Sequence, residues 1–253
     1  MNAYSSFAQV YDAFMDNIPY QAGCQYLCDI LHQYGITEGL VAELGCGTGT
    51  LTELMAASGY DMIGIDNSPD MLELALEKRQ VSGQDILYLL QDMREFELYG
   101  TVRSIISFCD SINYITEGAD LIQVFRLVNN YLDPGGYFIF DFHTEYYYNT
   151  VLGESIIAED RDEMSFIWDN YYDKETRMNE YLLSIFVQER SGLYRKFQEE
   201  HFQKAYSLTE IRESLLQAGL EYITAYDELS FQPPGTESTR IHVIAKEHEK
   251  NES

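Results

Sequence analysis

The chain contains few basic residues. It has 16 lysines and arginines against 42 aspartates and glutamates, which gives a formal net charge of -26 at pH 7. Because affinity for nucleic acid comes largely from lysine and arginine contacts to phosphate, a chain this acidic is poorly suited to DNA or RNA. An anionic membrane surface repels it as well. The composition therefore favours a small-molecule partner, although a high charge can also serve solubility alone.

Long apolar runs and paired cysteines are also missing. No stretch of about 18 apolar residues occurs, and the chain does not begin with a basic segment followed by an apolar one. The sequence therefore predicts neither a membrane span nor a signal peptide, and a cytoplasmic location. The spacing of the four cysteines, Cys24, Cys28, Cys46 and Cys109, fits neither a zinc site nor a disulfide framework. We expect free thiols and no metal site.

The most informative segment is VAELGCGTGT, at residues 41–50. An apolar strand over residues 40–44 leads directly into Gly45, Gly47 and Gly49, and a helix-forming stretch follows. A strand, a glycine turn and a helix in this order form the place where an α/β sheet binds a cofactor against exposed backbone N–H groups. Glycine permits the positive φ angles and the close approach that such a turn requires.

The spacing of the glycines argues against a dinucleotide. The pattern G-x-G-x-x-G needs a small residue where this chain has Thr50, and the third glycine comes one place early, at Gly49. Glu43 lies two residues before the first glycine. A carboxylate there suits a ligand with an ammonium group better than it suits a pyrophosphate.

A second unit follows at residues 61–66, a short apolar strand that ends at Asp66. An acidic side chain at this place accepts hydrogen bonds from ribose hydroxyls, and the alternative is an ordinary turn residue. Ser68 then predicts a helix N-cap with Pro69 in the first turn. A third strand is predicted over residues 86–90.

The segments ELGCGTG, residues 43–49, and LDPGGYFIFD, residues 132–141, resemble motifs of the class I S-adenosylmethionine-dependent methyltransferases. The arrangement is most similar to the bacterial YqeM-like small-molecule methyltransferases with a β-sheet lid. The resemblance implies S-adenosylmethionine as the cofactor and S-adenosylhomocysteine as the product. It also implies that Asp92 accepts from the adenine amine and that Met93 packs on the ring. The alternative is that Asp92 is a helix N-cap and Met93 a core residue.

The candidate cofactor-binding residues are spread over five segments of the chain. They are Tyr11, Glu43, Gly45, Cys46, Gly47, Gly49, Asp66, Asn67, Asp92, Met93, Cys109, Asp110 and Tyr114.

Strands alternate with helices to about residue 144, which predicts a Rossmann-like doubly wound sheet, mostly parallel with an antiparallel last strand. Residues 145–205 break this pattern with tyrosine-rich, strand-like runs and predict an inserted antiparallel β-sheet that forms a lid on the acceptor side. The cofactor-binding domain then comprises residues 1–144, with an N-terminal helical cap over 1–36, and residues 206–253.

The acceptor is expected over the carboxyl ends of the parallel strands. His143 there is a candidate general base, which Asp141 orients or replaces; the alternative is a polar bridge between sheet and insert. An aromatic stripe near the N-terminus, which includes Tyr11, is either core or a cover over the cofactor. The tyrosines of the insert would suit an amine acceptor, or they only pack the insert.

Together these features favour a methyltransferase that moves a methyl group to a small-molecule N or O acceptor by in-line displacement. A cofactor-binding module without transfer activity is the alternative, and a nicotinamide-dependent oxidoreductase is disfavoured by the glycine spacing. The expected protein is a monomer or a homodimer.

Overall fold

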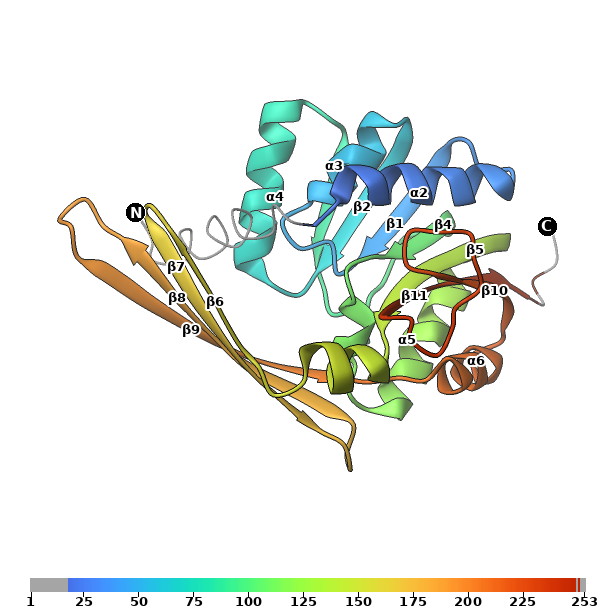
Figure 1. Cartoon of the computed structure of the whole chain (residues 1–253). Helices are drawn as coiled ribbons and strands as arrows, with labels where there is room; N and C mark the ends of the chain where they lie inside the picture. Colours follow the sequence, from blue (N-terminus) through green and yellow to red (C-terminus); the bar gives the residue numbers. More distant parts are fainter. Residues whose placement is uncertain (1–17, 249, 251–253) are drawn as a thin grey trace.

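The computed structural model describes residues 18–248 and 250. Its centre is a seven-stranded sheet with the strand order β10-β11-β5-β4-β1-β2-β3 (Figure 1). Every neighbouring pair is parallel except the two that β11 makes, because β11 runs antiparallel to both β5 and β10. The predicted Rossmann-like sheet with an antiparallel last strand is confirmed. Its strands are β1 (Gly39–Leu44), β2 (Tyr60–Asp66), β3 (Ile86–Leu90), β4 (Val102–Ser107), β5 (Leu132–His143), β10 (Leu220–Asp227) and β11 (Arg240–Glu247).

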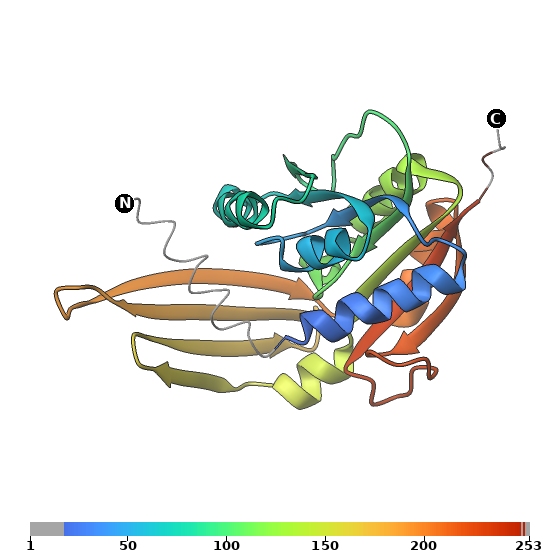
Figure 2. The same cartoon turned by 90° about the horizontal axis from the view of Figure 1, so that it is seen from above.

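Helices cover both faces of this sheet. The helices on one face are α2 (Tyr20–Gln33), α3 (Thr50–Ala57) and α4 (Pro69–Ser82), and those on the other are α5 (Gly118–Tyr131) and α6 (Leu208–Gln217) (Figures 1 and 2). The apolar residues of α5 recur at helical spacing, and all four that face the sheet are fully buried, so packing rather than capping holds this helix in place. Within residues 18–248, none of the helices has both the length and the apolarity that crossing a bilayer requires.

The helix starts follow the local sequence signals. The Ser68 hydroxyl accepts from the backbone of Met71, and proline occupies the first turn of α4. Ser207 and Glu210 form the expected capping box at the start of α6. These caps satisfy N–H groups that would otherwise lack a partner at the helix ends.

Between β5 and α6 the chain leaves the central sheet and forms a second, four-stranded antiparallel sheet in the order β6-β7-β8-β9. A π-helical turn, η3 (Tyr147–Leu152), precedes it, and the sheet extends to one side of the main body (Figures 1 and 2). The predicted antiparallel insert is confirmed, with β6 as an additional strand whose residues are nearly all exposed and so carry no alternating pattern. The strands are β6 (Ile156–Arg161), β7 (Met164–Asp173), β8 (Met178–Gln188) and β9 (Tyr194–Lys204).

The insert is fastened at the carboxyl end of β5. Thr144 forms an isolated parallel bridge with Tyr206, so the chain enters and leaves the insert at neighbouring points. Asn113, in the short 3-10 turn η2 (Ser111–Tyr114) after β4, is fully buried and donates to the backbone oxygens of both His143 and Lys204. One side chain therefore joins β4, β5 and β9.

Gly49 provides a test of how the glycine turn is packed. Its φ is +74°, and an added Cβ would lie 2.4 Å from the Tyr88 hydroxyl oxygen. Gly83, at the end of α4, has nearly the same φ, +72°, but open space around it. We expect Gly83→Ala to lower the free energy of unfolding by about 1 kcal/mol, the cost of the left-handed backbone, and Gly49→Ala by about 3 kcal/mol, because overpacking adds to that cost.

Chemical denaturation of both variants measures the difference. Equal losses would mean that the backbone conformation alone requires Gly49 and that Tyr88 gives way.

Candidate active site

A cavity of about 450 Å³, here called the first cavity, opens at the carboxyl ends of β1 and β2. Most of the candidate cofactor residues line it, although they come from distant parts of the sequence. Those that line it are Glu43, Gly45, Cys46, Gly47, Asp66, Asn67, Asp92, Met93, Cys109 and Tyr114. Tyr11 lies outside the described residues. Gly49 packs on Tyr88, and Asp110 lines a different cavity.

Glu43 ends β1 as a buried carboxyl group, 2% exposed, in the wall of the first cavity. Its Oε2 accepts a hydrogen bond from Thr52 Oγ1 on α3, at 2.5 Å. Burial raises its pKa to about 8, even though the Thr52 hydrogen bond favours the ionised form. A buried acid in this state is ready to ionise when a cation arrives beside it.

Asp66 ends β2 and holds the glycine turn in shape. Its Oδ2 accepts from the backbone N–H of Gly47 at 2.7 Å, and its Oδ1 accepts from that of Ser68 at 2.8 Å. Burial raises its pKa, although these backbone donors stabilise the charged form. Because each carboxylate oxygen has two lone pairs, both remain able to accept from a ligand hydroxyl.

Asp92 lines the first cavity together with an arginine that the sequence did not single out. The Asp92 carboxylate accepts from Arg94 Nε at 2.9 Å and also from its Nη2, and these hydrogen bonds lower the pKa of Asp92. Arg94 therefore fixes the orientation of a carboxylate at the cavity wall. Met93 lines the cavity beside this pair.

A second cavity, also of about 450 Å³, lies between the central sheet and the insert. Phe108 and Cys109, which follow β4, line both cavities and form their common wall. Aromatic and aliphatic side chains of β7 and β8 line the side formed by the insert. The polar residues of the opposite side are Asp110, His143, Glu228, Thr239 and Arg240.

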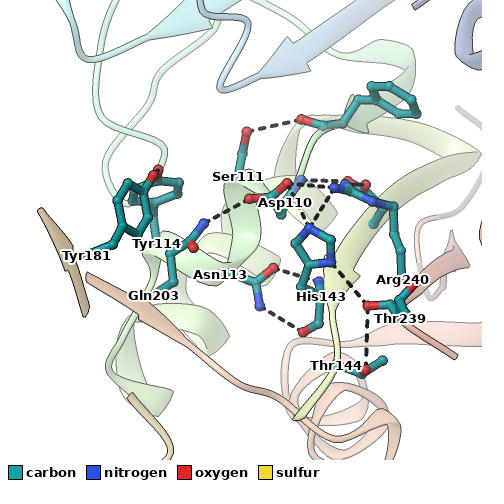
Figure 3. Close-up of polar contacts among 12 residues, drawn as sticks. Asp110, Ser111, Asn113, Tyr114, His143, Thr144, Tyr181, Gln203, Thr239 and Arg240 are labelled. Carbon is teal, nitrogen blue, oxygen red and sulfur yellow. Dashed lines mark hydrogen bonds and ion pairs between the residues drawn. The ribbon is translucent and has the colours of Figure 1, made fainter. Parts of the chain in front are cut away.

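Arg240 organises the floor of the second cavity (Figure 3). As the first residue of the antiparallel β11, it lies directly beside His143, the last residue of β5. Its guanidinium forms ion pairs with Asp141, which is fully buried, and with Asp110, at 2.8 Å. Burial alone would raise the pKa of Asp141, but the guanidinium outweighs it and the pKa lies below the usual range.

His143 is held in one tautomer by this network. Arg240 Nη2 lies 2.8 Å from His143 Nε2, and because a guanidinium can only donate, Nε2 accepts. Nδ1 then carries the hydrogen and donates to the Thr239 oxygen at 3.1 Å. Burial lowers the pKa of His143 despite the nearby Asp110 carboxylate. To act as a base, Nε2 would first have to give up its bond to Arg240.

The backbone between the two cavities is strained. Cys109 and Asp110 have φ angles of +60° and +52°, a left-handed conformation that residues other than glycine rarely adopt. Gln203 of β9 donates to Asp110 Oδ2 at 2.8 Å and helps to hold this turn from the insert side. The turn directs Asp110 into the second cavity, while Cys109 reaches both.

Comparison with known proteins identifies the family. A family model described as a methyltransferase domain matches residues 41–136. "Putative methyltransferase YqeM" of Bacillus subtilis (strain 168) is 30% identical over 244 residues, 96% of both chains. The crystal structure of a S-adenosylmethionine-dependent methyltransferase from Clostridium acetobutylicum ATCC 824 matches with a TM-score of 0.88 and 28% identity, over 98% of this chain and 100% of the other.

The chain belongs to the S-adenosylmethionine-dependent methyltransferases. A more distant relative is the dTDP-3-amino-3,4,6-trideoxy-alpha-D-glucopyranose N,N-dimethyltransferase of Streptomyces venezuelae, 27% identical over 131 residues, 51% of this chain and 54% of that protein.

The cofactor of this methyltransferase is S-adenosylmethionine, and the first cavity fits it. The cavity has the volume of a ligand site and presents buried carboxylates rather than a set of cations, which suits a ligand with an ammonium group, a sulfonium and two ribose hydroxyls. In residues 18–248 no group of three or more His, Cys, Asp or Glu side chains is arranged to hold a metal ion.

Sequence reasoning missed several residues of this methyltransferase site. Arg240 precedes an apolar strand and shows its role only once β11 is known to be antiparallel and next to β5. Glu199 and Gln203 come from the insert, whose register decides which side chains face the site.

The raised pKa of Glu43 gives a testable linkage between cofactor and proton. With a pKa of about 8 in the folded protein, the carboxyl stays mostly protonated at pH 7, whereas an ammonium group bound beside it favours the carboxylate. Binding of S-adenosylhomocysteine at pH 7 is therefore expected to release close to one proton, measured by calorimetry in buffers of different ionisation enthalpy. Glu43→Gln should reduce this release.

The same shift has a consequence for stability. In the pH range from 4.5 to about 8 the unfolded chain loses the Glu43 proton and the folded protein keeps it, so wild-type stability falls as pH rises through this range. Glu43→Gln should lose less stability over that range. Parallel pH profiles of the two proteins would show that Glu43 is ionised in the folded state.

Proposed function

We propose that this methyltransferase moves the methyl group of S-adenosylmethionine to an N or O atom of a small molecule bound in the second cavity. The observation that carries the proposal is the common wall of the two cavities, Phe108 and Cys109, at the carboxyl end of β4. A donor in one cavity and an acceptor in the other would meet across this wall. When bound, S-adenosylmethionine supplies a methyl group on a positively charged sulfur.

The residues of the first cavity are proposed to hold the cofactor at both ends. Glu43 would face the ammonium group, and Asp66 would accept from the ribose hydroxyls while it keeps its two backbone donors. Asp92 and Met93 would lie against the adenine. Fixing donor and acceptor in line supplies most of the catalysis in a displacement of this kind, because the bond that forms and the bond that breaks both belong to the two bound molecules.

A small acceptor is supported by the size and the charge of the site. The second cavity, at about 450 Å³, falls in the range of small-ligand pockets. The net charge of -26 opposes a polynucleotide. The relative from Streptomyces venezuelae is named for dimethylation of an amino sugar, which supports nitrogen as one possible methylated atom.

The proposal predicts formation of S-adenosylhomocysteine. Purified protein mixed with S-adenosylmethionine should release it with members of a panel of small amines and alcohols, and not with tRNA or duplex DNA. Adenosyl ligands at about a hundred times their Kd should raise the unfolding free energy by roughly 2.7 kcal/mol. Asp66→Ala should lose this stabilisation, whereas Asp61→Ala, at the exposed opposite end of β2, should keep it.

Stabilisation without product from any acceptor would favour a binding module without transfer activity. Stabilisation by NAD(H) alone would contradict the cofactor assignment.

His143 allows a second test, with an acceptor identified by that panel. If Nε2 serves only to accept from Arg240, His143→Gln should keep turnover within about a factor of ten, because an amide oxygen can replace the ring nitrogen. If His143 is a general base, both His143→Gln and His143→Ala should lose about 100-fold or more in kcat with unchanged cofactor Kd. We expect the first result, because the geometry commits Nε2 to Arg240.

A further inference from the structure

Most of the charged and ring N–H donors of the second cavity already have protein acceptors. Arg240 donates three of its five N–H groups, to Asp141, Asp110 and His143. His143 Nδ1 donates to the Thr239 oxygen. The Trp168 indole N–H donates to Asn170 Oδ1 at 3.2 Å. An anionic ligand would therefore compete with protein acceptors for most of these donors.

Negative charge dominates the lining of this cavity. Asp110, Glu159 and Glu228 line it with a single guanidinium, that of Arg240. Two ion-pair partners lie just outside the lining: Asp141 pairs with Arg240, and Arg161 pairs with Glu159. With these included, four carboxylates face two guanidiniums.

A chain of hydrogen bonds leads from the second cavity to the first. The hydroxyl of Tyr181, which lines the second cavity, lies 2.8 Å from that of Tyr114. The Tyr114 oxygen lies 3.0 Å from His201 Nδ1, and His201 Nε2 donates to the Glu199 carboxylate at 3.1 Å. The chain therefore ends on a further carboxylate, in the lining of the first cavity.

Aromatic faces complete this environment. Phe166 and Trp168 of β7, Tyr181 of β8 and Tyr147 of η3 line the same cavity. The rings of Trp168 and Tyr181 lie 4.5 Å apart between centroids, and that of Tyr147 stacks on His143 at 3.7 Å. The negative face of an aromatic ring attracts a cation, most strongly for tryptophan.

From this balance of carboxylates and aromatic faces we infer that the second cavity selects an amine carried on an apolar body, whose N–H groups donate to the carboxylates. The inference rests on the proposed function only for its final step, the transfer of the methyl group to that nitrogen. The binding preference stands on the cavity alone and can be measured without turnover.

Three probes of similar shape test the preference: phenethylamine, 2-phenylethanol and 3-phenylpropanoate. Calorimetric titration of the full chain saturated with S-adenosylhomocysteine should show the amine binding about tenfold more tightly than the alcohol, and the carboxylate weakest. Equal or tighter binding of the alcohol or the carboxylate would overturn the inference, and so would the absence of amine binding at millimolar concentration.

A matched pair of variants locates the binding site. Trp168 lines the cavity, and Tyr171, on the same strand, is 53% exposed and does not. Trp168→Leu should weaken phenethylamine binding about tenfold, and Tyr171→Leu should leave it unchanged. An equal loss in both variants would place the amine outside this cavity.

The two proposals can fail separately. Amine binding without release of S-adenosylhomocysteine from S-adenosylmethionine would contradict transfer and leave the binding preference in place. Product release with alcohols and never with amines would support transfer and overturn the choice of an amine.

Discussion

The guanidinium of Arg240 is the contact on which the arrangement of the second cavity depends. This planar group, on the first residue of β11, donates to Asp141 and His143 at the end of β5 and to Asp110 in the strained turn after β4. Removing it would leave Asp141 charged and fully buried without its partner, a costly state in a protein interior. Arg240 therefore contributes to the position of His143, to the Cys109–Asp110 turn and to the floor of the second cavity, together with Asn113 and Gln203 (Figure 3).

The carboxylates of the first cavity, unlike those bound by Arg240, face few cations. Glu43 and Asp66 end adjacent parallel strands, and burial raises the pKa of each. Two acids held in this way oppose folding at neutral pH. In the proposed complex, Glu43 would gain a counterion from the ammonium group and Asp66 would gain hydrogen-bond donors from the ribose. The free protein therefore carries an unfavourable electrostatic free energy at this site, and its relief on ligand binding contributes to the affinity.

Much of the cofactor side could be predicted from the sequence because its signals are local. A strand, a glycine turn and a capped helix are read within about 30 residues, and Glu43 and Asp66 occupy fixed places in that pattern. The acceptor side could be predicted only as a location. Arg240 depends on the pairing of β11 with β5, nearly 100 residues earlier, and Tyr181 and His201 depend on the register of β8 against β9. The sequence predicts that Asp110 lines the cofactor site with its neighbour Cys109. Two successive left-handed residues instead direct the Asp110 side chain into the second cavity. No periodicity in the sequence reports such a turn.

The insert enters and leaves the central fold at one point, where Thr144 pairs with Tyr206. Because the two ends already touch, the entropy of closing this loop depends only weakly on how much chain lies between them. The segment can lengthen, shorten or change its residues while the seven-stranded sheet keeps its register. In evolutionary terms, the wall that the insert gives to the second cavity can then diversify as one exchangeable module, while the strands that end at the first cavity are inherited unchanged.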